Sequence, residues 1–251
     1  MILTGHQPVY LPWLGLFHKI ALADTFVFMD QVQYLAGDWN NRNYIKTPQG
    51  KLLLTVPVSL KQGESLLLSD IVITQDSPRP ERRWQARHWK SIHLNYQHAP
   101  YFSQYADFFR WLYVEKEWTR LSELNEAMLR YLLDVLGIKV RFLRMSDCQF
   151  QGKKADLILD MCRQLGATIN VFGALGRDYV DSQAFEREGI QVYFQDYRHR
   201  QYPQQFGPFV SHLSVVDLLF NCGPGSLEVV MEGNVSKSAL LTALETARSV
   251  G

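Results

Sequence analysis

The residues near the start of the chain with the clearest chemical potential are His6 and Gln7, in the short sequence GHQP. A histidine titrates near neutral pH and can transfer a proton or bind phosphate. A glutamine amide can recognise a base, a sugar hydroxyl or another amide. Pro8 and Pro12 bracket the aromatic turn that follows, which contains Tyr10. We therefore predict His6 as catalytic, with Gln7 and Tyr10 binding substrate, although a histidine bonded to backbone in a tight loop is an equal alternative.

A carboxylate, Asp30, follows the next apolar run along the chain. Residues 13–23 form an amphipathic pattern that predicts a helix, and Thr25 to Met29 is typical of a buried strand. Strand, loop, helix and strand make a βαβ unit, in which the loops after the strand carboxyl ends converge on a ligand crevice. Asp30 could serve there as a general base, a helix cap or an ion-pair partner. We predict that His6 and Asp30 are the catalytic residues and that their two strands are parallel neighbours.

Amides and cations crowd the segment that leads into a predicted hairpin. Asn41, Arg42 and Lys46 lie within a few residues of one another, and this density indicates an anion or phosphate site. A solvated loop is an equal alternative. We expect all three to bind substrate, and we expect Arg42 and Lys46 to line one partly exposed pocket with His6 and Asp30.

The main basic cluster of the chain runs from Arg79 to Lys90 and contains two tryptophans. As a helix it could hold a phosphorylated ligand through His88 and Lys90, although a solvated face with the tryptophans turned inward is the more common arrangement. His88, His93 and His98 are spaced five residues apart rather than the four of a zinc helix, so we predict no metal site.

A third group of polar residues follows later predicted strands. Lys153 precedes a predicted helix whose free amides favour an anion, and Arg177 and Asp178 follow the strand predicted for 168–172. Successive αβ units bring such groups to one edge of an open sheet. We therefore predict that Lys153, Arg177 and Asp178 form a second wall of the crevice that holds His6. A surface ion pair of little consequence is the competing interpretation.

These residues need an α/β scaffold to position them. The patterns predict a mainly parallel sheet with flanking helices, a β-hairpin after the second strand and a helical insertion at about 80–137. They divide the chain into a single domain over 1–233 and a C-terminal amphipathic helix within 234–251. Among the individual expectations are a strand over 66–73 and helices over 81–95, 102–116 and 121–136.

Composition narrows the class of protein. With 47% apolar and 20% charged residues in 251, the chain is an ordinary globular sequence, and its net charge of +1 gives no reason to expect a nucleic-acid partner. Three cysteines without CxxC spacing favour a reducing compartment. No apolar run reaches the ~18 residues of a membrane span. We expect a cytoplasmic protein with a small-molecule substrate, anionic or nucleotide-linked. The cofactor and the oligomeric state stay open.

The order of these motifs resembles the WbqC-like family. The resemblance covers roughly residues 2–230 and rests on colinear motifs: His6-Gln7-Pro8, Pro12-Trp13-Leu14-Gly15, Trp39 with Asn41-Arg42-Asn43 and Lys46, His88-Trp89-Lys90, Asn95-Tyr96, Ala99-Pro100-Tyr101-Phe102, Gly152-Lys153-Lys154, Asp178-Tyr179 and Asp217-Leu218-Leu219-Phe220-Asn221. The glycine-containing loop at 173–176 departs from the Ser-Gly form of the family. The resemblance implies a role in bacterial surface-polysaccharide (O-antigen) biosynthesis and supplies no reaction.

Two functions follow from these observations. The first is a transferase or ligase that acts on an activated small molecule, such as a nucleotide-linked sugar or an acyl or aminoacyl donor. Residues 2–34 are similar in layout to nucleotidyltransferases of the pantothenate synthetase type, but the paired histidines of that signature are missing, because His18 falls inside the predicted helix. The second is a non-catalytic protein that holds a glycan or a partner in the same cleft. The cluster of His, Asp, Lys and Arg at strand exits favours the enzyme.

Overall fold

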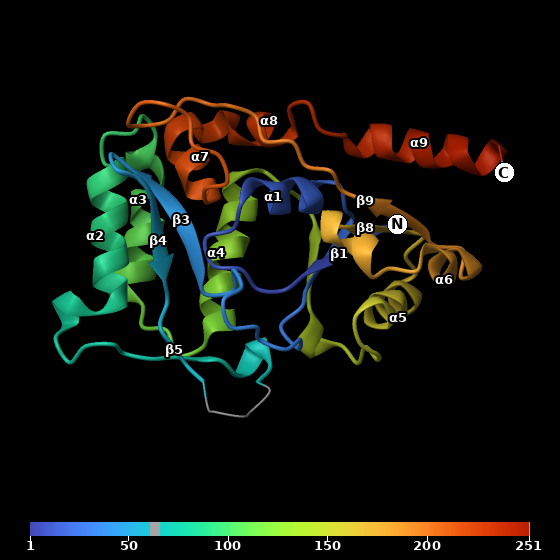
Figure 1. The fold of residues 1–251 in the computed structure, drawn as a ribbon, viewed down its shortest axis with the longest axis horizontal. Coiled ribbons are helices and arrows are strands. Elements are labelled where there is room, and N and C mark those ends of the chain that lie inside the picture. Colours follow the sequence, from blue (N-terminus) through green and yellow to red (C-terminus); the bar gives the residue numbers. More distant parts are fainter. Residues whose placement is uncertain (61–65, 251) are drawn as a thin grey trace.

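A five-stranded parallel sheet forms the centre of the protein, in a computed structural model that describes residues 1–60 and 66–250 (Figure 1). Its strands lie in the order β7-β2-β1-β8-β9, and all the neighbouring pairs are parallel. The predicted α/β class is confirmed. The strands are β1 (Ile2–His6), β2 (Thr25–Phe28), β7 (Arg141–Arg144), β8 (Ile169–Phe172) and β9 (Gln191–Phe194).

The predicted βαβ unit at the start of the chain is also confirmed. β1 and β2 pair in parallel, with His6 opposite Phe28, and α1 (Leu14–Ala21) connects them. The chain then winds outward to β7, crosses back through α5 (Ala155–Leu165) to β8 on the other side of β1, and ends the sheet with β9. The winding direction therefore reverses between β1 and β8. In doubly wound sheets, ligands bind outside the strand carboxyl ends at this switch point.

Helices cover both faces of the sheet. On one face, Phe17 of α1 joins the main core cluster with Phe26 and Phe28 of β2. On the other face, α5 and α6 (Ser182–Arg187) form a second cluster around Leu3 and Val27. The C-terminal helix α9 (Lys237–Val250) buries Leu240 against β1 and the end of α1. Gly251, the last residue of the predicted C-terminal segment, lies outside the described residues.

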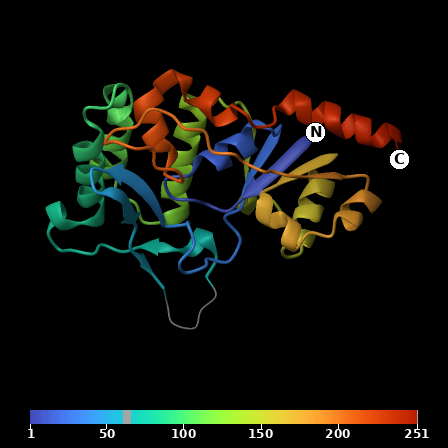
Figure 2. The ribbon, with the colours of Figure 1, turned by 45° about the horizontal axis from the view of Figure 1, so that its top comes forward.

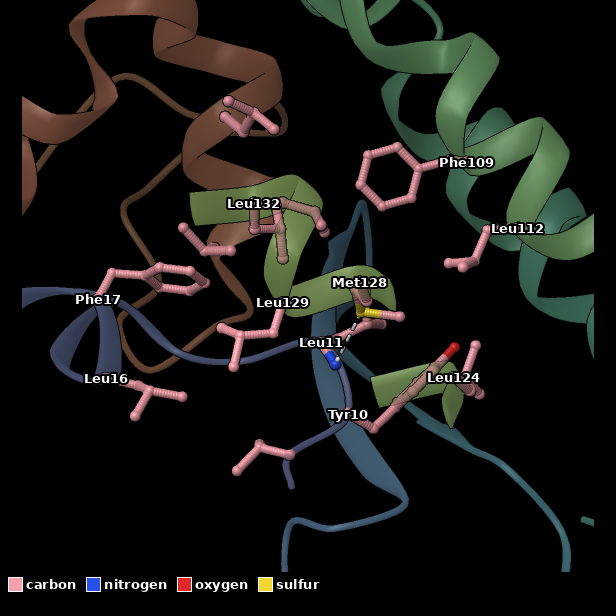
Figure 3. Packing of buried hydrophobic residues seen from close by; sticks show 14 of the residues in the cluster. Tyr10, Leu11, Leu16, Phe17, Phe109, Leu112, Leu124, Met128, Leu129 and Leu132 are labelled. Carbon is pink, nitrogen blue, oxygen red and sulfur yellow. Dashed lines mark hydrogen bonds between the residues drawn. The ribbon is translucent and has the colours of Figure 1, made fainter. Parts of the chain in front are cut away.

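A helical lobe stands beside the sheet, on the left in Figures 1 and 2. It contains the predicted hairpin and the predicted insertion. Its main elements are β3 (Arg42–Thr47), β4 (Gly50–Thr55), α2 (Trp84–Tyr96), α3 (Phe102–Arg110) and α4 (Leu121–Val135). The loop after β1 enters the core of this lobe, where the backbone N–H of Leu11 lies 3.3 Å from Sδ of Met128 (Figure 3). The loop that follows His6 is thus anchored at both ends, by β1 and by the core of the lobe.

One predicted strand in this lobe was wrong, and one predicted helix changes type in its last turn. The strand over 66–73 is a 3-10 turn at Leu68–Asp70 followed by the two-residue strand β6 (Val72–Ile73), which pairs with β5 (Val58–Ser59). The chain bends because the N–H of Ser69 donates to the carbonyl of Asp30, across the loop that follows β2. The helix over 102–116 stops as α3 at Arg110 and continues as one π turn, Trp111–Glu115.

The last segment of the lobe returns from the sheet. A long strap, residues 195–214, runs from β9 past α1 to α7 (Val215–Cys222), which is followed by α8 (Ser226–Met231) (Figure 1). The ring of Tyr197 in this strap lies against Gly15, where a Cβ would approach the ring to 3.1 Å. No helix in the described ranges is both long and apolar enough to cross a membrane.

Candidate functional site

His6 lies at the carboxyl end of β1, beside the switch point of the sheet. Its ring is partly buried and meets Trp13 edge-on, with 5.4 Å between the ring centroids. Nδ1 lies 2.8 Å from the carbonyl oxygen of Gln7. A carbonyl can only accept a hydrogen bond, so Nδ1 carries the proton and, in the neutral ring, Nε2 keeps its lone pair. The backbone therefore fixes the tautomer that can accept a proton from a ligand.

The imidazole of His6 is held in its neutral form. Burial and, next in size, the positive charge of Lys19 lower the pKa of His6 from 6.5 to about 3, against an opposing effect of the bond to Gln7. His6 is thus uncharged at neutral pH and offers Nε2 as an acceptor rather than a positive charge. The pKa of His6 rises, and His6 becomes a stronger base, when a negative group offsets the positive charge of Lys19.

Lys19 is the most unusual side chain of the site. Every residue of α1 from Leu14 to Ile20 is buried, and Lys19 is only 4% exposed. Its Nζ donates to the carbonyl of Gly5, at 3.0 Å. Burial alone lowers the pKa of Lys19 from 10.5 to about 7, and no carboxylate in residues 1–60 or 66–250 offsets its charge. A buried ammonium without an anion is costly, and strongly shifted pKa values are a feature of many functional sites.

The strap fixes how α1 presents Lys19. Gln195, directly after β9, donates through Nε2 to the carbonyl of Gly15 at 2.8 Å, and the same nitrogen lies 2.7 Å from Nδ1 of His18. His18 Nε2 in turn lies 2.9 Å from the carbonyl of Val235 and donates to it. These bonds tie α1 to the carboxyl end of β9 and to the segment before α9. The neighbouring residue Lys19 therefore reaches Gly5 from a fixed helix.

Asp30 occupies the expected edge of the sheet but already has partners there. It is buried, and its two carboxylate oxygens accept from the backbone N–H and the hydroxyl of Ser146, at 2.9 and 2.6 Å. Ser146 follows β7, so Asp30 joins the exits of β2 and β7. This arrangement gives Asp30 a role in holding two loops, and its catalytic role stays a prediction.

The loop after β8 reaches the same edge from the other side of β1. Arg177 is exposed, with its guanidinium 5.5 Å from the ring centroid of Phe194 and Nη2 3.3 Å from the carbonyl of that residue. Asp178 beside it is exposed. Lys153 lines a hollow of about 430 Å³ between the N-terminal ends of α5 and α6, together with Tyr179 and Asp181. The three predicted wall residues thus follow β7 and β8 at the carboxyl edge, and no contact between Lys153 and Arg177 is formed within the described residues.

Lys46 is engaged in a buried network away from His6. It is 1% exposed, and its Nζ donates to the side chain of Gln204 and to the carbonyl of Pro208, at 3.1 and 2.7 Å. Gln204 also donates to Asp217, which accepts from Tyr96 and from Tyr202 at 2.8 Å each. Burial lowers the pKa of Lys46 and raises that of Asp217. This network fastens the strap to β3 and α7.

The remaining predicted binding residues also lie in or near the lobe. Tyr10 and His88 are buried, with the hydroxyl of Tyr10 2.7 Å from Nδ1 of His88. Lys90 is exposed on α2, which lies across the hairpin from the sheet (Figures 1 and 2). Asn41 is buried and donates to the carbonyl of Val56. Of the predicted hairpin residues, partly exposed Arg42 is the one whose side chain remains open to a ligand.

Sequence reasoning missed Lys19 and Gln195. The signal for Lys19 was present, since it is the one charged residue in the apolar segment 14–21. Gln195 gave none beyond its place at the end of a strand. Lys19 bonds to Gly5, the residue before His6, and Gln195 bonds to Gly15 of the helix that carries Lys19. No set of three or more His, Cys, Asp or Glu within the described residues could hold a metal ion.

Comparisons with known proteins place the chain in a family. A family model described as the WbqC-like protein family matches residues 7–229, which include the His6 neighbour Gln7, Lys19 and the loop after β8. The chain belongs to the WbqC-like protein family. This WbqC-like protein is 36% identical over 218 residues to a Mycobacterium tuberculosis (strain ATCC 25618 / H37Rv) protein named "Uncharacterized protein Rv1507c", covering 86% of this chain and 92% of that protein. No solved structure matches this chain.

Proposed function

We propose that this WbqC-like protein is a transferase or ligase that moves a group from an activated donor to an acceptor in bacterial surface-polysaccharide biosynthesis. The donor is a nucleotide-linked sugar or an acyl or aminoacyl compound, and the place of action is the cytoplasm. The observation that carries the proposal is a buried lysine with no carboxylate partner among the described residues, beside a neutral histidine of fixed tautomer, at the switch point of a doubly wound sheet. The three thiols are free, as in proteins of reducing compartments.

Each side chain has a separate task in this proposal. The ammonium of Lys19 binds the phosphate or carboxylate of the donor. A hydroxyl or amine of the acceptor then attacks the transferred group, its new bond forms as the bond to the leaving group breaks, and its proton passes to Nε2 of His6. A donor anion at Lys19 offsets the charge that lowers the pKa of His6, so donor binding makes His6 a stronger base.

One observation favours the second candidate, a non-catalytic protein that binds a glycan or a partner. A histidine with a pKa of about 3 is a weak base at neutral pH, and Asp30 has both oxygens engaged by Ser146. In that case His6 accepts a hydrogen bond from the ligand and no bond is broken.

The test separates these candidates by what stabilises the protein. Thermal unfolding is measured with nucleotide sugars, acyl donors and neutral glycans, because a ligand of the native state raises the unfolding temperature. A donor that stabilises the wild type is then incubated with candidate acceptors, and products are detected by mass spectrometry. We expect stabilisation by a donor, lost in Lys19→Met, and product formation, lost in His6→Gln. Stabilisation by glycans alone would instead establish the binding protein.

A further inference from the structure

An aromatic surface lies next to His6 on the loop that enters the hairpin. We call Gln7, Asp38, Trp39 and Tyr44 the aromatic ledge. Trp39 is 40% exposed, Tyr44 is partly exposed, and their ring centroids are 5.9 Å apart. Large aromatic side chains are normally buried, so an exposed tryptophan beside a second ring is a surface available to a ligand.

The ledge is built before any ligand arrives. The N–H of Tyr10 donates to the carbonyl of Trp39, and the side-chain amide of Asn43 donates to the carbonyl of Leu11, at 3.2 and 2.6 Å. These bonds fasten the loop after β2 and the start of β3 to the loop after β1. One bond joins two backbone groups and the other joins the buried side chain of Asn43 to the backbone, so the loop that carries Trp39 is held against the loop after His6.

Hydrogen-bond acceptors border the rings. Gln7 donates through Nε2 to Oδ2 of Asp38 at 2.8 Å, and Oδ1 of Asp38 accepts from the N–H of Trp39 at 2.7 Å. Oε1 of Gln7 has no hydrogen-bond partner among the described residues, and each carboxylate oxygen of Asp38 has a further lone pair. The ledge therefore pairs apolar rings with several acceptors, and the ammonium of Lys51 lies 5.7 Å from the centroid of the Tyr44 ring. This combination suits a ligand that has a C–H face and donates hydroxyl hydrogens.

We propose that the aromatic ledge binds a neutral pyranose ring of the acceptor. Its C–H face lies on the ring of Trp39, and its hydroxyls donate to Asp38 and to Gln7. Gln7 follows His6 in the chain, so the ledge begins one residue after the proton acceptor of the site. The inference deepens the proposed function by naming the acceptor chemistry, while the binding itself requires no transfer.

Saturation-transfer NMR with methyl pyranosides tests this proposal. The probes are methyl β-D-glucopyranoside, methyl β-D-galactopyranoside and methyl N-acetyl-β-D-glucosaminide, and uridine monophosphate is the anionic comparison. We expect at least one pyranoside to receive saturation on its C–H protons. Trp39→Ala should weaken its binding about tenfold, equivalent to about 1.4 kcal/mol, and Trp39→Phe should restore most of the loss. Asp38→Asn should weaken binding less than Trp39→Ala, since an amide oxygen still accepts.

Trp111 supplies the matched control, because it is 37% exposed on the helical lobe. Trp111→Ala should bind the pyranoside as the wild type does. Equal binding by wild type and Trp39→Ala, or no saturation of any pyranoside, would overturn the proposal. His6→Gln separates sugar binding at the ledge from the proposed function. Retained sugar binding with lost transfer in this variant supports both the ledge and the proposed function. Transfer that survives Trp39→Ala with an unchanged acceptor KM rules out the ledge and leaves the proposed function intact.

Discussion

Replacement of Lys19 by methionine should make the protein more stable at neutral pH. Methionine has a similar length and no charge, so it removes the cost of burying an ammonium in α1. A pKa lowered from 10.5 to about 7 corresponds to a cost of about 5 kcal/mol, since each tenfold change in the dissociation constant is worth about 1.4 kcal/mol. The loss of the hydrogen bond to Gly5 reduces this stabilisation by about 1 kcal/mol.

The sign of the pH dependence follows from the two states of the chain. Between pH 7 and 10.5 the unfolded chain binds a proton at Lys19 that the native protein releases, so the free energy of unfolding rises with pH across this window. Below pH 7 both states are protonated and the full cost is present. The advantage of Lys19→Met should therefore be largest below pH 7 and disappear as the pH approaches 10.5.

Urea unfolding at a series of pH values measures this difference. Lys139→Met is the control, because Lys139 is exposed in the loop before β7 and its replacement should change the free energy of unfolding little at any pH. The reasoning is refuted if Lys19→Met is less stable than the wild type at pH 6, or if its advantage is the same at pH 6 and pH 10. The first result would mean that Lys19 is charged and well compensated in the native protein, and the second that the gain in stability does not come from its charge.

Three other perturbations test the same structure. His6→Gln should reduce the loss of stability on acidification. With a pKa of about 3 in the native protein, His6 gains a proton only in the unfolded chain as the pH falls from 6.5 to 3. Identical acid unfolding of variant and wild type would contradict the burial of His6. Asp217→Asn should lower the free energy of unfolding in urea by about 2–4 kcal/mol, since an amide replaces a buried carboxylate that accepts from two tyrosines and Gln204. A change near zero would mean that the network does not fasten the strap. Gly15→Leu should lower the free energy of unfolding by about 1–3 kcal/mol and expose Tyr197 to solvent, because the new Cβ would lie 3.1 Å from the Tyr197 ring. Urea unfolding and tyrosine fluorescence measure the two effects. Unchanged stability would show that the strap is not packed on α1.

The sequence predicted the fold better than it predicted the site. Alternation of apolar runs and amphipathic segments was enough for the parallel pairing of β1 and β2, the hairpin at β3 and β4 and the helical insertion. The strand over 66–73 failed because its bend depends on a hydrogen bond from Ser69 to Asp30, which joins residues far apart in the chain. Local patterns carry no information about such contacts.

The same limit explains the site residues. The place of His6 at the carboxyl end of β1 could be predicted because a strand end can be recognised in a sequence, and its catalytic role stays a prediction. The sequence also predicted Lys46 as a cation accessible to a ligand. Lys46 is instead buried and donates to Gln204 and Pro208, which belong to the strap and lie far from Lys46 in the sequence. Lys19 was overlooked for the opposite reason, since a lysine in a helix is usually exposed and its burial depends on the packing of α1 between the sheet and the strap.

Proton uptake on donor binding tests the central claim, that Lys19 and His6 form the reactive site for an anionic donor. Calorimetric titrations at pH 8 with the stabilising donor, in two buffers of different ionisation enthalpy, give the number of protons bound. Lys19 with a pKa of about 7 is mostly neutral at this pH, and an anion beside it raises that pKa, so the wild type should take up about one proton. Lys19→Met should bind the donor more weakly and take up none. Equal affinity and equal proton uptake in the two proteins would place the donor elsewhere and contradict the account.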